Sequence, residues 1–180
     1  MQTILLNNGI EMPLLGYGLF QVPPQEAERC TRDALEVGYR LIDTAQAYGN
    51  EQGVGDAIRQ SGIPREDIFI VTKIWITNAG EEKAARSIEH SLSKLQTDYV
   101  DLLLIHQAYG DVFGSWRAME KAYAQGKTRA IGVSNMARHL HRSPLDGSSN
   151  AASLLSPNRC TRNAWRRTST SSISRSQRRT

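Results

Sequence analysis

Four residues that can hold or move a proton stand out along this chain: Asp43, Tyr48, Lys73 and His106. A phenol has a pKa of about 10 and is a poor acid near neutrality, unless a nearby cation favours its ionised form. We expect Lys73 to be that cation, with Asp43 holding the ammonium through a charge-assisted hydrogen bond. Such a charge lowers a pKa by roughly one to three units, which would bring the Tyr48 phenol toward the working range. His106 would orient a carbonyl oxygen.

Most of these residues end predicted strands. Short runs of β-branched, aromatic and other apolar residues are too short to be helices and predict buried strands instead. These runs span residues 40–43, 67–73, 99–106 and 128–135, and they end in Asp43, Lys73, His106 and Ser134–Asn135. Because barrel enzymes place their chemistry at the carboxyl ends of parallel strands, four such endings indicate a common site.

Helical periodicity fills the stretches between the strands. The predicted helices span residues 24–37, 52–60, 81–95 and 115–124, and a hairpin around Asn8–Gly9 and a short strand over 14–18 precede them. The alternation predicts an α/β fold, and the continuous apolar character of the strands indicates a parallel sheet buried on both faces. The alternation alone does not separate an open doubly wound sheet from a (β/α)8 barrel.

Several segments resemble the aldo-keto reductase family. Residues 38–45 (Gly-Tyr-Arg-Leu-Ile-Asp-Thr-Ala), 48–51 (Tyr-Gly-Asn-Glu) and 54–55 (Val-Gly) resemble its first signature. Residues 70–75 and 103–106 resemble the segments that carry the family's lysine and histidine, and residues 127–135 resemble its fifth strand. The likeness runs from about residue 3 to Asn135 in the expected order and spacing. It is nearest to small bacterial reductases similar to 2,5-diketogluconate reductase.

The resemblance implies a (β/α)8 TIM barrel with a hairpin plug, of which about the first five β/α units are present. It implies NADPH as cofactor, without a Rossmann domain, and a small carbonyl substrate. Hydride would pass from the nicotinamide to a carbonyl carbon while Tyr48 protonates the oxygen. Asp43 and Lys73 would tune Tyr48, and His106 would orient the substrate. The family is usually monomeric, whereas the raw edges of a partial barrel favour self-association.

The resemblance also assigns residues around these four. Ser134 and Asn135 would hold the nicotinamide carboxamide, with Gly18 and Asp43 also touching the cofactor. Phe20 and Trp75 would line the substrate pocket together with His106, although ordinary rim aromatics are as good an interpretation of the first two.

The chain departs from the family pattern at two places and then leaves it. Ala108 stands where a proline is usual, and Met136 stands where an aromatic residue is expected. From Ala137 on the resemblance ends, so we expect two parts: residues 1–136 as the barrel segment and residues 137–180 as an unrelated tail. An out-of-frame or mis-predicted extension is our hypothesis for the tail, and an intact reading frame across the Asn135 codon with no restorable barrel downstream would contradict it.

The two parts differ sharply in charge. Residues 137–180 hold nine arginines, no lysine and one acid, which leaves thirteen bases and seventeen acids in residues 1–136. The tail composition, rich in Arg and Ser and without helical or strand periodicity, predicts disorder. Arginine attracts phosphate, so a nucleic acid or an acidic membrane is an alternative partner, but the tail lacks lysine and, apart from Trp165, interleaved aromatics, and we expect no specific binding of either.

The composition also bears on the compartment and on metals. No run of apolar residues is long enough for a membrane span, and the N-terminus lacks the features of a signal peptide. The two cysteines are far apart and have no metal-ligand partners nearby, which fits a reducing cytoplasm better than a disulfide framework. Arg138, His139 and His141 have no third ligand placed beside them, so we expect no metal site.

Two other classes of protein compete with a working reductase. A short-chain dehydrogenase would use a glycine pattern such as residues 49–55 and a Tyr-x-x-x-Lys pair such as Tyr123 and Lys127. Here the glycines do not follow the first strand and the pair lies too close to them, so a chance pattern is preferred. The second alternative is a catalytically inert aldo-keto-like fragment that binds NADPH weakly or not at all.

Overall fold

The computed structural model describes residues 2–135. Met1 and residues 136–180 lie outside the described residues, and so do the predicted tail, its expected disorder and the histidines at 139 and 141. Within the described range, every predicted helix is found, and every predicted strand is present in at least part of its length.

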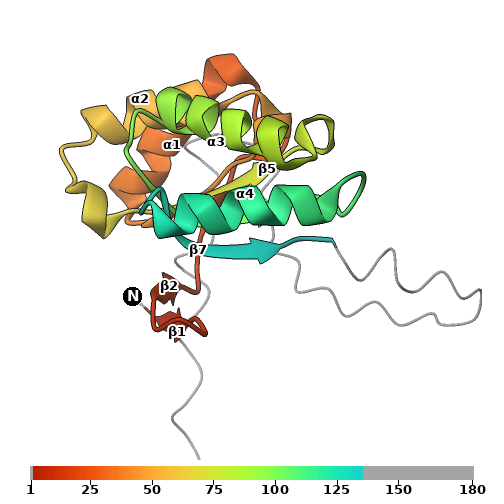
Figure 1. The fold of residues 1–180 in the computed structure, drawn as a ribbon. Helices are drawn as coiled ribbons and strands as arrows, with labels where there is room; N and C mark the ends of the chain where they lie inside the picture. Colours follow the sequence, from red (N-terminus) through yellow and green to blue (C-terminus); the bar gives the residue numbers. More distant parts are fainter. Residues whose placement is uncertain (1, 136–180) are drawn as a thin grey trace, which may run out of the picture.

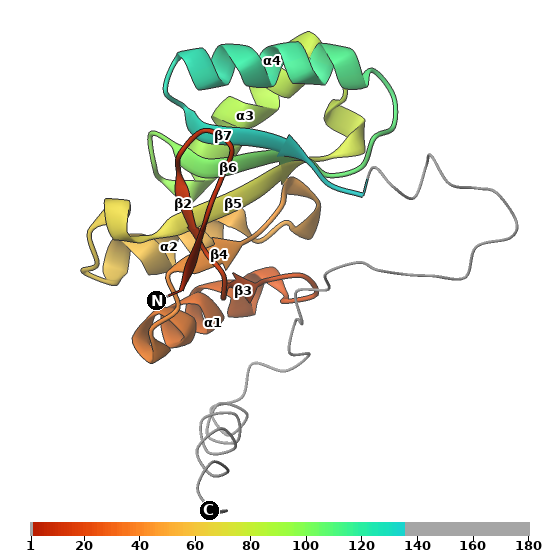
Figure 2. The same ribbon diagram turned by 90° about the horizontal axis from the view of Figure 1, so that it is seen from below.

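The N-terminal segment forms the predicted hairpin. Strands β1 (Thr3–Leu5) and β2 (Glu11–Pro13) pair in antiparallel fashion, with Thr3 opposite Pro13. The turn needs the positive φ of 83° at Gly9, a conformation that glycine adopts without a steric penalty. The hairpin lies across the face of the sheet opposite the helices (Figure 2).

Five parallel strands make up the main sheet. They are β3 (Tyr17–Gly18), β4 (Leu41–Asp43), β5 (Phe69–Ile74), β6 (Val100–Ile105) and β7 (Thr128–Val133). Each strand pairs with the next one along the chain, so the order in space equals the order in the sequence. An open doubly wound sheet reverses its strand order at a switch point, and the described strands contain no such reversal. This order is that of a barrel segment, and it contradicts the short-chain dehydrogenase interpretation.

Four helices cover one face of this sheet (Figure 1). They are α1 (Pro24–Val37), α2 (Glu51–Gln60), α3 (Glu81–Leu95) and α4 (Val112–Ala124). Three one-turn 3-10 helices lie in the loops: η1 (Gln46–Tyr48), η2 (Arg65–Asp67) and η3 (Ile76–Asn78). Helix α4 begins three residues earlier than predicted because the Asp111 carboxylate caps it, accepting from the Gly114 backbone N–H at 2.7 Å. Strand β3 is shorter than predicted, since Leu14 and Leu15 are exposed.

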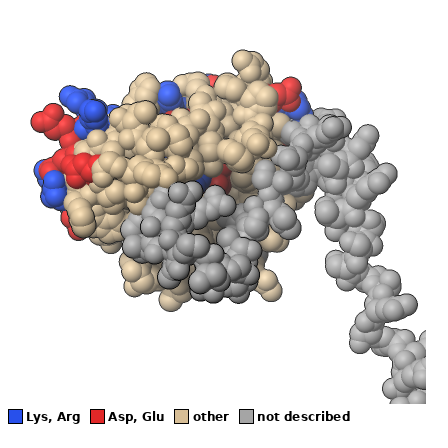
Figure 3. Space-filling model, turned by 90° about the vertical axis from the view of Figure 1, so that its right-hand side faces the viewer, with Lys and Arg blue, Asp and Glu red and all other residues tan. Residues whose placement is uncertain are grey.

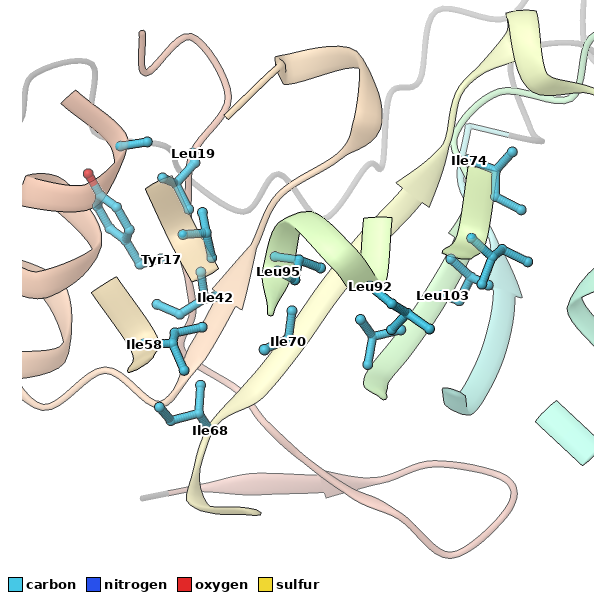
Figure 4. Close-up of a cluster of buried hydrophobic side chains, with 14 of the residues drawn as sticks. Tyr17, Leu19, Ile42, Ile58, Ile68, Ile70, Ile74, Leu92, Leu95 and Leu103 are labelled. Atoms are coloured by element: carbon cyan, nitrogen blue, oxygen red, sulfur yellow. The ribbon is translucent and has the colours of Figure 1, made fainter. Parts of the chain in front are cut away.

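The alternation of side chains divides the apolar residues of the sheet into two cores. Ile42, Ile70 and Leu103 point toward the helices and are at most 1% exposed (Figure 4). Their neighbours Leu41 and Val71 point the other way and belong to a second cluster, against which hairpin residues pack. Asp43 and Lys73 follow these two inner residues by two positions, so they fall on the same inner face of the sheet.

A buried carboxylate ties the amino-terminal ends of the strands together. Asp101 in β6 is completely buried and accepts from Arg65 Nη2 at 2.8 Å, from Arg129 Nη1 at 2.8 Å and from the Ile70 backbone N–H at 2.9 Å. Asn8 of the hairpin adds a bond from its Nδ2 to the Arg129 carbonyl oxygen at 2.9 Å. We call Asp101, Arg65, Arg129 and Asn8 the base cluster, because they lie at the end of the strands opposite to Asp43 and Lys73.

Candidate active site

The structure brings the four proposed catalytic residues to one end of the sheet. Asp43 is the last residue of β4, Lys73 lies near the end of β5, and His106 directly follows β6. Tyr48 is on η1, the single turn that follows β4. Figure 3 shows the molecule from the side toward which β7 runs; most of the visible described surface there is uncharged, and charged side chains appear at the rim and in a small patch near the centre.

Lys73 and Asp43 form a close ion pair. Lys73 Nζ lies 2.5 Å from Asp43 Oδ1 and also donates to the Thr44 carbonyl oxygen at 2.9 Å. Only 7% of Lys73 is exposed. Burial lowers the pKa of Lys73, and the neighbouring Asp43 carboxylate partly offsets that effect. The expected charge-assisted bond between the two side chains is therefore present in the structure.

The expected lowering of the Tyr48 pKa is wrong for the ligand-free chain. Burial, followed by the negative charge of Asp43, raises the pKa of Tyr48 to about 12. Lys73 Nζ does lie 5.1 Å from the centre of the Tyr48 ring, but its charge is balanced by Asp43 at half that distance. The pair acts on the phenol nearly as a dipole, so Tyr48 stays protonated over the physiological range.

His106 is held as a neutral imidazole between two aromatic rings. Its ring centre lies 5.6 Å from that of Tyr48 and 5.1 Å from that of Trp75, both in edge-on geometry. Burial, with a smaller contribution from the positive charge of Lys73, lowers the pKa of His106 to about 4. Its Nδ1 is buried and has no hydrogen-bond partner among the described residues.

Phe20 and Trp75, the proposed substrate residues, each contact one ring of the Tyr48–His106 pair. The Phe20 ring lies 5.3 Å from the Tyr48 ring, and Trp75 contacts His106; Phe20 is 53% exposed. Successive ring contacts thus link Phe20, Tyr48, His106 and Trp75. We call these four rings the aromatic wall, and Lys73 Nζ lies 5.1 Å from the centre of its Tyr48 ring.

The proposed cofactor residues lie at the same end of the sheet. Gly18 is the register partner of Asp43 across β3 and β4. Ser134 continues β7 by donating its backbone N–H to the Ile105 carbonyl oxygen at 2.8 Å. Asn135 has a positive φ of 57°, and its Nδ2 donates to the His106 carbonyl oxygen at 2.9 Å and to Ser134 Oγ at 3.0 Å. All of these residues therefore adjoin the proposed catalytic residues.

Comparison with known proteins identifies this arrangement. Residues 14–143 match the Aldo/keto reductase family. The chain belongs to that family. It is 48% identical over 139 residues to glyoxal reductase of Bacillus subtilis, an alignment that covers 76% of this chain and 50% of that protein. It is 45% identical over 135 residues to morphine 6-dehydrogenase of Pseudomonas putida, covering 73% of this chain and 46% of that protein.

Solved structures of the family show the same fold. An aldo/keto reductase from Brucella melitensis superimposes with a TM-score of 0.73 at 45% identity, covering 80% of this chain and 58% of that chain. A putative 2,5-diketo-D-gluconic acid reductase B superimposes with a TM-score of 0.70 at 43% identity, covering 74% of this chain and 48% of that chain. The predicted TIM-barrel fold is thereby confirmed. The chain spans about half the length of the curated relatives that it matches.

The sequence analysis did not single out the residues behind the candidate site of this family member. Thr44 and Thr72 adjoin Asp43 and Lys73 in the sequence but point to the helix side of the sheet, where both are buried. Thr44 Oγ1 donates to Asn50 Oδ1, and Thr72 Oγ1 donates to Glu51 Oε1, both at 2.7 Å. Asn50 Nδ2 also donates to the carbonyl oxygens of Leu19 (3.0 Å) and Val22 (3.1 Å).

The start of α2 therefore holds three strand ends from the outside. The signal was present in the Tyr-Gly-Asn-Glu segment, because the side chains of buried Asn and Glu must find hydrogen-bond partners. Gln46, at the start of η1, is a further residue that the sequence analysis did not single out.

Two further findings concern metal ligands and membrane-spanning helices. No group of three or more potential metal ligands occurs among residues 2–135. Across the same residues, no helix combines the length and apolar character that a membrane span requires.

Proposed function

We propose that this chain carries the proton-transfer part of an NADPH-dependent oxidoreductase that reduces aldehydes and ketones to alcohols. The observation that carries the proposal is the position of the Tyr48 ring, which lies 5.1 Å from Nζ of the buried Lys73–Asp43 pair and edge-on against His106. A carbonyl reduction needs a proton donor, a group that stabilises the anion left behind, and a neutral group that orients the oxygen.

Each residue has a definite part in that reaction. The bound cofactor would supply the hydride that adds to the carbonyl carbon. The Tyr48 phenol would give its proton to the carbonyl oxygen, which completes the alcohol and leaves a tyrosinate. The Lys73 ammonium, held by Asp43, would stabilise that tyrosinate at short range in a poorly solvated site. His106 would hydrogen-bond the substrate oxygen without competing as an acid, because its pKa of about 4 keeps it neutral.

The residues after β7 fit a nicotinamide carboxamide. The Asn135 amide N–H groups are used by the His106 carbonyl and Ser134 Oγ, which leaves the Asn135 oxygen as an acceptor and the Ser134 hydroxyl hydrogen as a donor. A carboxamide offers the complementary pair, an N–H donor and a C=O acceptor. Gly18 and Asp43 would line the same position. The choice of NADPH over NADH rests on the family resemblance alone.

The substrate class follows from the aromatic wall. Phe20 and Trp75 offer apolar ring surface on both sides of the polar groups, which suits a small carbonyl compound with an apolar body. Among the relatives, the names glyoxal reductase and morphine 6-dehydrogenase support interconversion of a carbonyl and an alcohol. The cytoplasm remains the predicted compartment, on the cysteine content alone.

An NADPH oxidation assay with a panel of aldehydes and diketones tests the proposal. The purified chain should consume NADPH in the presence of substrate, and Tyr48→Phe should lower turnover while leaving the fold intact. Loss of the phenol proton removes the acid, an effect on the order of a hundredfold to ten-thousandfold. Turnover in Tyr48→Phe within about tenfold of the wild type would contradict the assignment of the acid.

The inert fragment is the second candidate, and one observation favours it. Among the described residues, β7 pairs with β6 on one side only and β3 pairs with β4 on one side only, so each has an edge without a described partner. Unpaired edges favour self-association. The same assay separates the candidates, because an inert fragment shows no turnover in either variant, and sedimentation velocity would show whether the chain is a monomer.

A further inference from the structure

Gln46 begins η1, two residues before Tyr48, and every hydrogen-bonding position of its side-chain amide is used. Its Nε2 donates to the Ser87 carbonyl oxygen at 3.2 Å and to Ser91 Oγ at 3.1 Å, both in α3. Its Oε1 accepts from the Trp75 backbone N–H and from Asn78 Nδ2, each at 2.9 Å. The orientation of the amide is fixed, because Trp75 N–H can only donate and the Ser87 carbonyl can only accept.

These bonds join two loops that the chain does not connect directly. Trp75 and Asn78 stand at the two ends of the one-turn helix η3, so a single oxygen of Gln46 bridges that whole turn. The two N–H bonds then fasten the same side chain to the middle of α3. Tyr48 and Trp75, which sit on the two joined loops, are thus held at a set separation.

The separation matters because the His106 ring contacts one residue of each loop. Its ring centre lies 5.6 Å from that of Tyr48 and 5.1 Å from that of Trp75. His106 itself has no side-chain hydrogen bond through Nδ1 to hold it among the described residues. Contact with these two rings, which we call the His106 slot, and not a hydrogen bond at Nδ1, therefore orients the imidazole.

The loop that carries Tyr48 has other anchors at its ends. Before η1, the Thr44 backbone N–H donates to the Val71 carbonyl oxygen at 2.9 Å, and after η1, Asn50 is tied to Thr44 and to the Leu19 carbonyl oxygen. These bonds do not involve the Gln46 side chain. Loss of the Gln46 amide would consequently leave the loop attached at both ends and free to shift in the middle, where Tyr48 stands.

We propose that Gln46 is a positioning residue of the active site, whose side-chain amide fixes the Tyr48 loop against Trp75 and so sets the slot that orients His106. Only the expected effect of Gln46 on catalysis rests on the proposed reductase function. The geometric part, the control of the His106 slot, concerns the folded chain itself.

The test compares three variants of the full chain with the wild type. Gln46→Ala removes all four bonds. Gln46→Glu keeps an oxygen that accepts from Trp75 N–H and Asn78 but loses the donor to the Ser87 carbonyl. Gln52→Ala is the matched control, because Gln52 is exposed on α2 and its side-chain bonds to residues within 2–135, at 3.4 Å, go only to Asp56 on the same helix.

Nuclear magnetic resonance titration of His106 gives the first readout. We expect Gln46→Ala to raise the pKa of His106 from about 4 toward its ordinary value, because a wider slot admits water. Gln46→Glu should show a smaller rise and Gln52→Ala none. If Gln46→Ala fails to fold, Asn78→Ala, which deletes one of the four bonds, should move the titration in the same direction by less. A wild-type titration in Gln46→Ala, or in Asn78→Ala where that variant replaces it, would overturn the proposal.

Steady-state kinetics give the second readout. Misplacement by about 1 Å costs up to a hundredfold in rate, so kcat of Gln46→Ala should fall about ten- to a hundredfold with a smaller change in KM, and Gln46→Glu should recover part of it. An unchanged kcat beside an active wild type would contradict the role of Gln46. A wild type without turnover would contradict the reductase function instead, and the titration would still decide the role of Gln46.

Discussion

The base cluster around Asp101 offers a prediction that does not depend on catalysis. Replacing Asp101 by alanine removes the acceptor of three bonds, from Arg65 Nη2, Arg129 Nη1 and the Ile70 backbone N–H. The carboxylate side chain is 1% exposed, whereas the side chains of Arg65 and Arg129 are 20% and 44% exposed. The substitution therefore leaves the buried Ile70 N–H without its acceptor, and it leaves Arg65 and Arg129, which can partly regain contact with water, without their anionic partner.

The magnitude follows from these exposures. Breaking a buried ion pair by removing one partner costs roughly 3–5 kcal/mol, and rehydration of the two arginines places this case at the lower end, about 3 kcal/mol. Asp101→Asn keeps one oxygen acceptor but loses the charge, so its cost should be about 1–2 kcal/mol. For a folded part of this size, a loss of about 3 kcal/mol lowers Tm by roughly 10 °C.

Urea unfolding followed by circular dichroism measures the effect. The midpoint should fall in the order wild type, Asp101→Asn and Asp101→Ala, with an unchanged slope against urea concentration. Asp98→Ala is the control, since Asp98 lies close by in the sequence but is exposed. If Asp101→Ala costs less than about 1 kcal/mol, or no more than Asp98→Ala, the cluster does not stabilise the amino-terminal ends of the strands and our reasoning is refuted.

Two further predictions concern stability. The pKa of His106 is lowered from 6.5 to about 4, so between these pH values the unfolded chain binds a proton at His106 that the folded chain does not. The free energy of unfolding should therefore fall as the pH drops from 6.5 toward 4. In urea titrations over this range, the free energy of unfolding of His106→Asn should depend less steeply on pH than that of the wild type. Equal slopes would count against a buried neutral imidazole. A Cβ at Gly55 would lie 2.5 Å from the Lys94 carbonyl oxygen, so Gly55→Ala should cost about 1–3 kcal/mol by forcing α2 from α3; a midpoint equal to that of Gln52→Ala would show that the helices adjust freely.

The fold was predictable from the sequence to a large extent. The bounds of α1 and α3 are those that the apolar periodicity predicted, because each helix buries one clean stripe against the sheet. Strand β3 was overestimated, because Leu14 and Leu15 look like strand residues but are exposed in the described part of the chain. The choice between an open sheet and a barrel needed the strand order, which the alternation of elements alone does not contain.

The candidate site was predictable in its membership but not in its electrostatics. Asp43, Lys73 and His106 could be placed together because residues that end parallel strands share one edge of the sheet. The direction of the Tyr48 pKa shift could not be predicted, because it depends on how closely the Asp43 carboxylate approaches the Lys73 ammonium compared with the Tyr48 phenol. Gln46 escaped notice because a polar residue in a loop carries no signal of the four partners that surround it.

Because side chains alternate between the inner and outer faces along β5, this strand cannot accept the insertion of a single residue without exchanging its two faces. Thr72 faces α2 and Lys73 faces the catalytic end, so one codon inserted earlier in the strand would exchange the two sides and carry the ammonium into the helix layer. Length variation among descendants of this sequence should therefore collect in the loops, such as that between Ser61 and Pro64, and leave the strands untouched. For the same reason, segments engineered into such loops should leave Asp43, Lys73 and His106 in place.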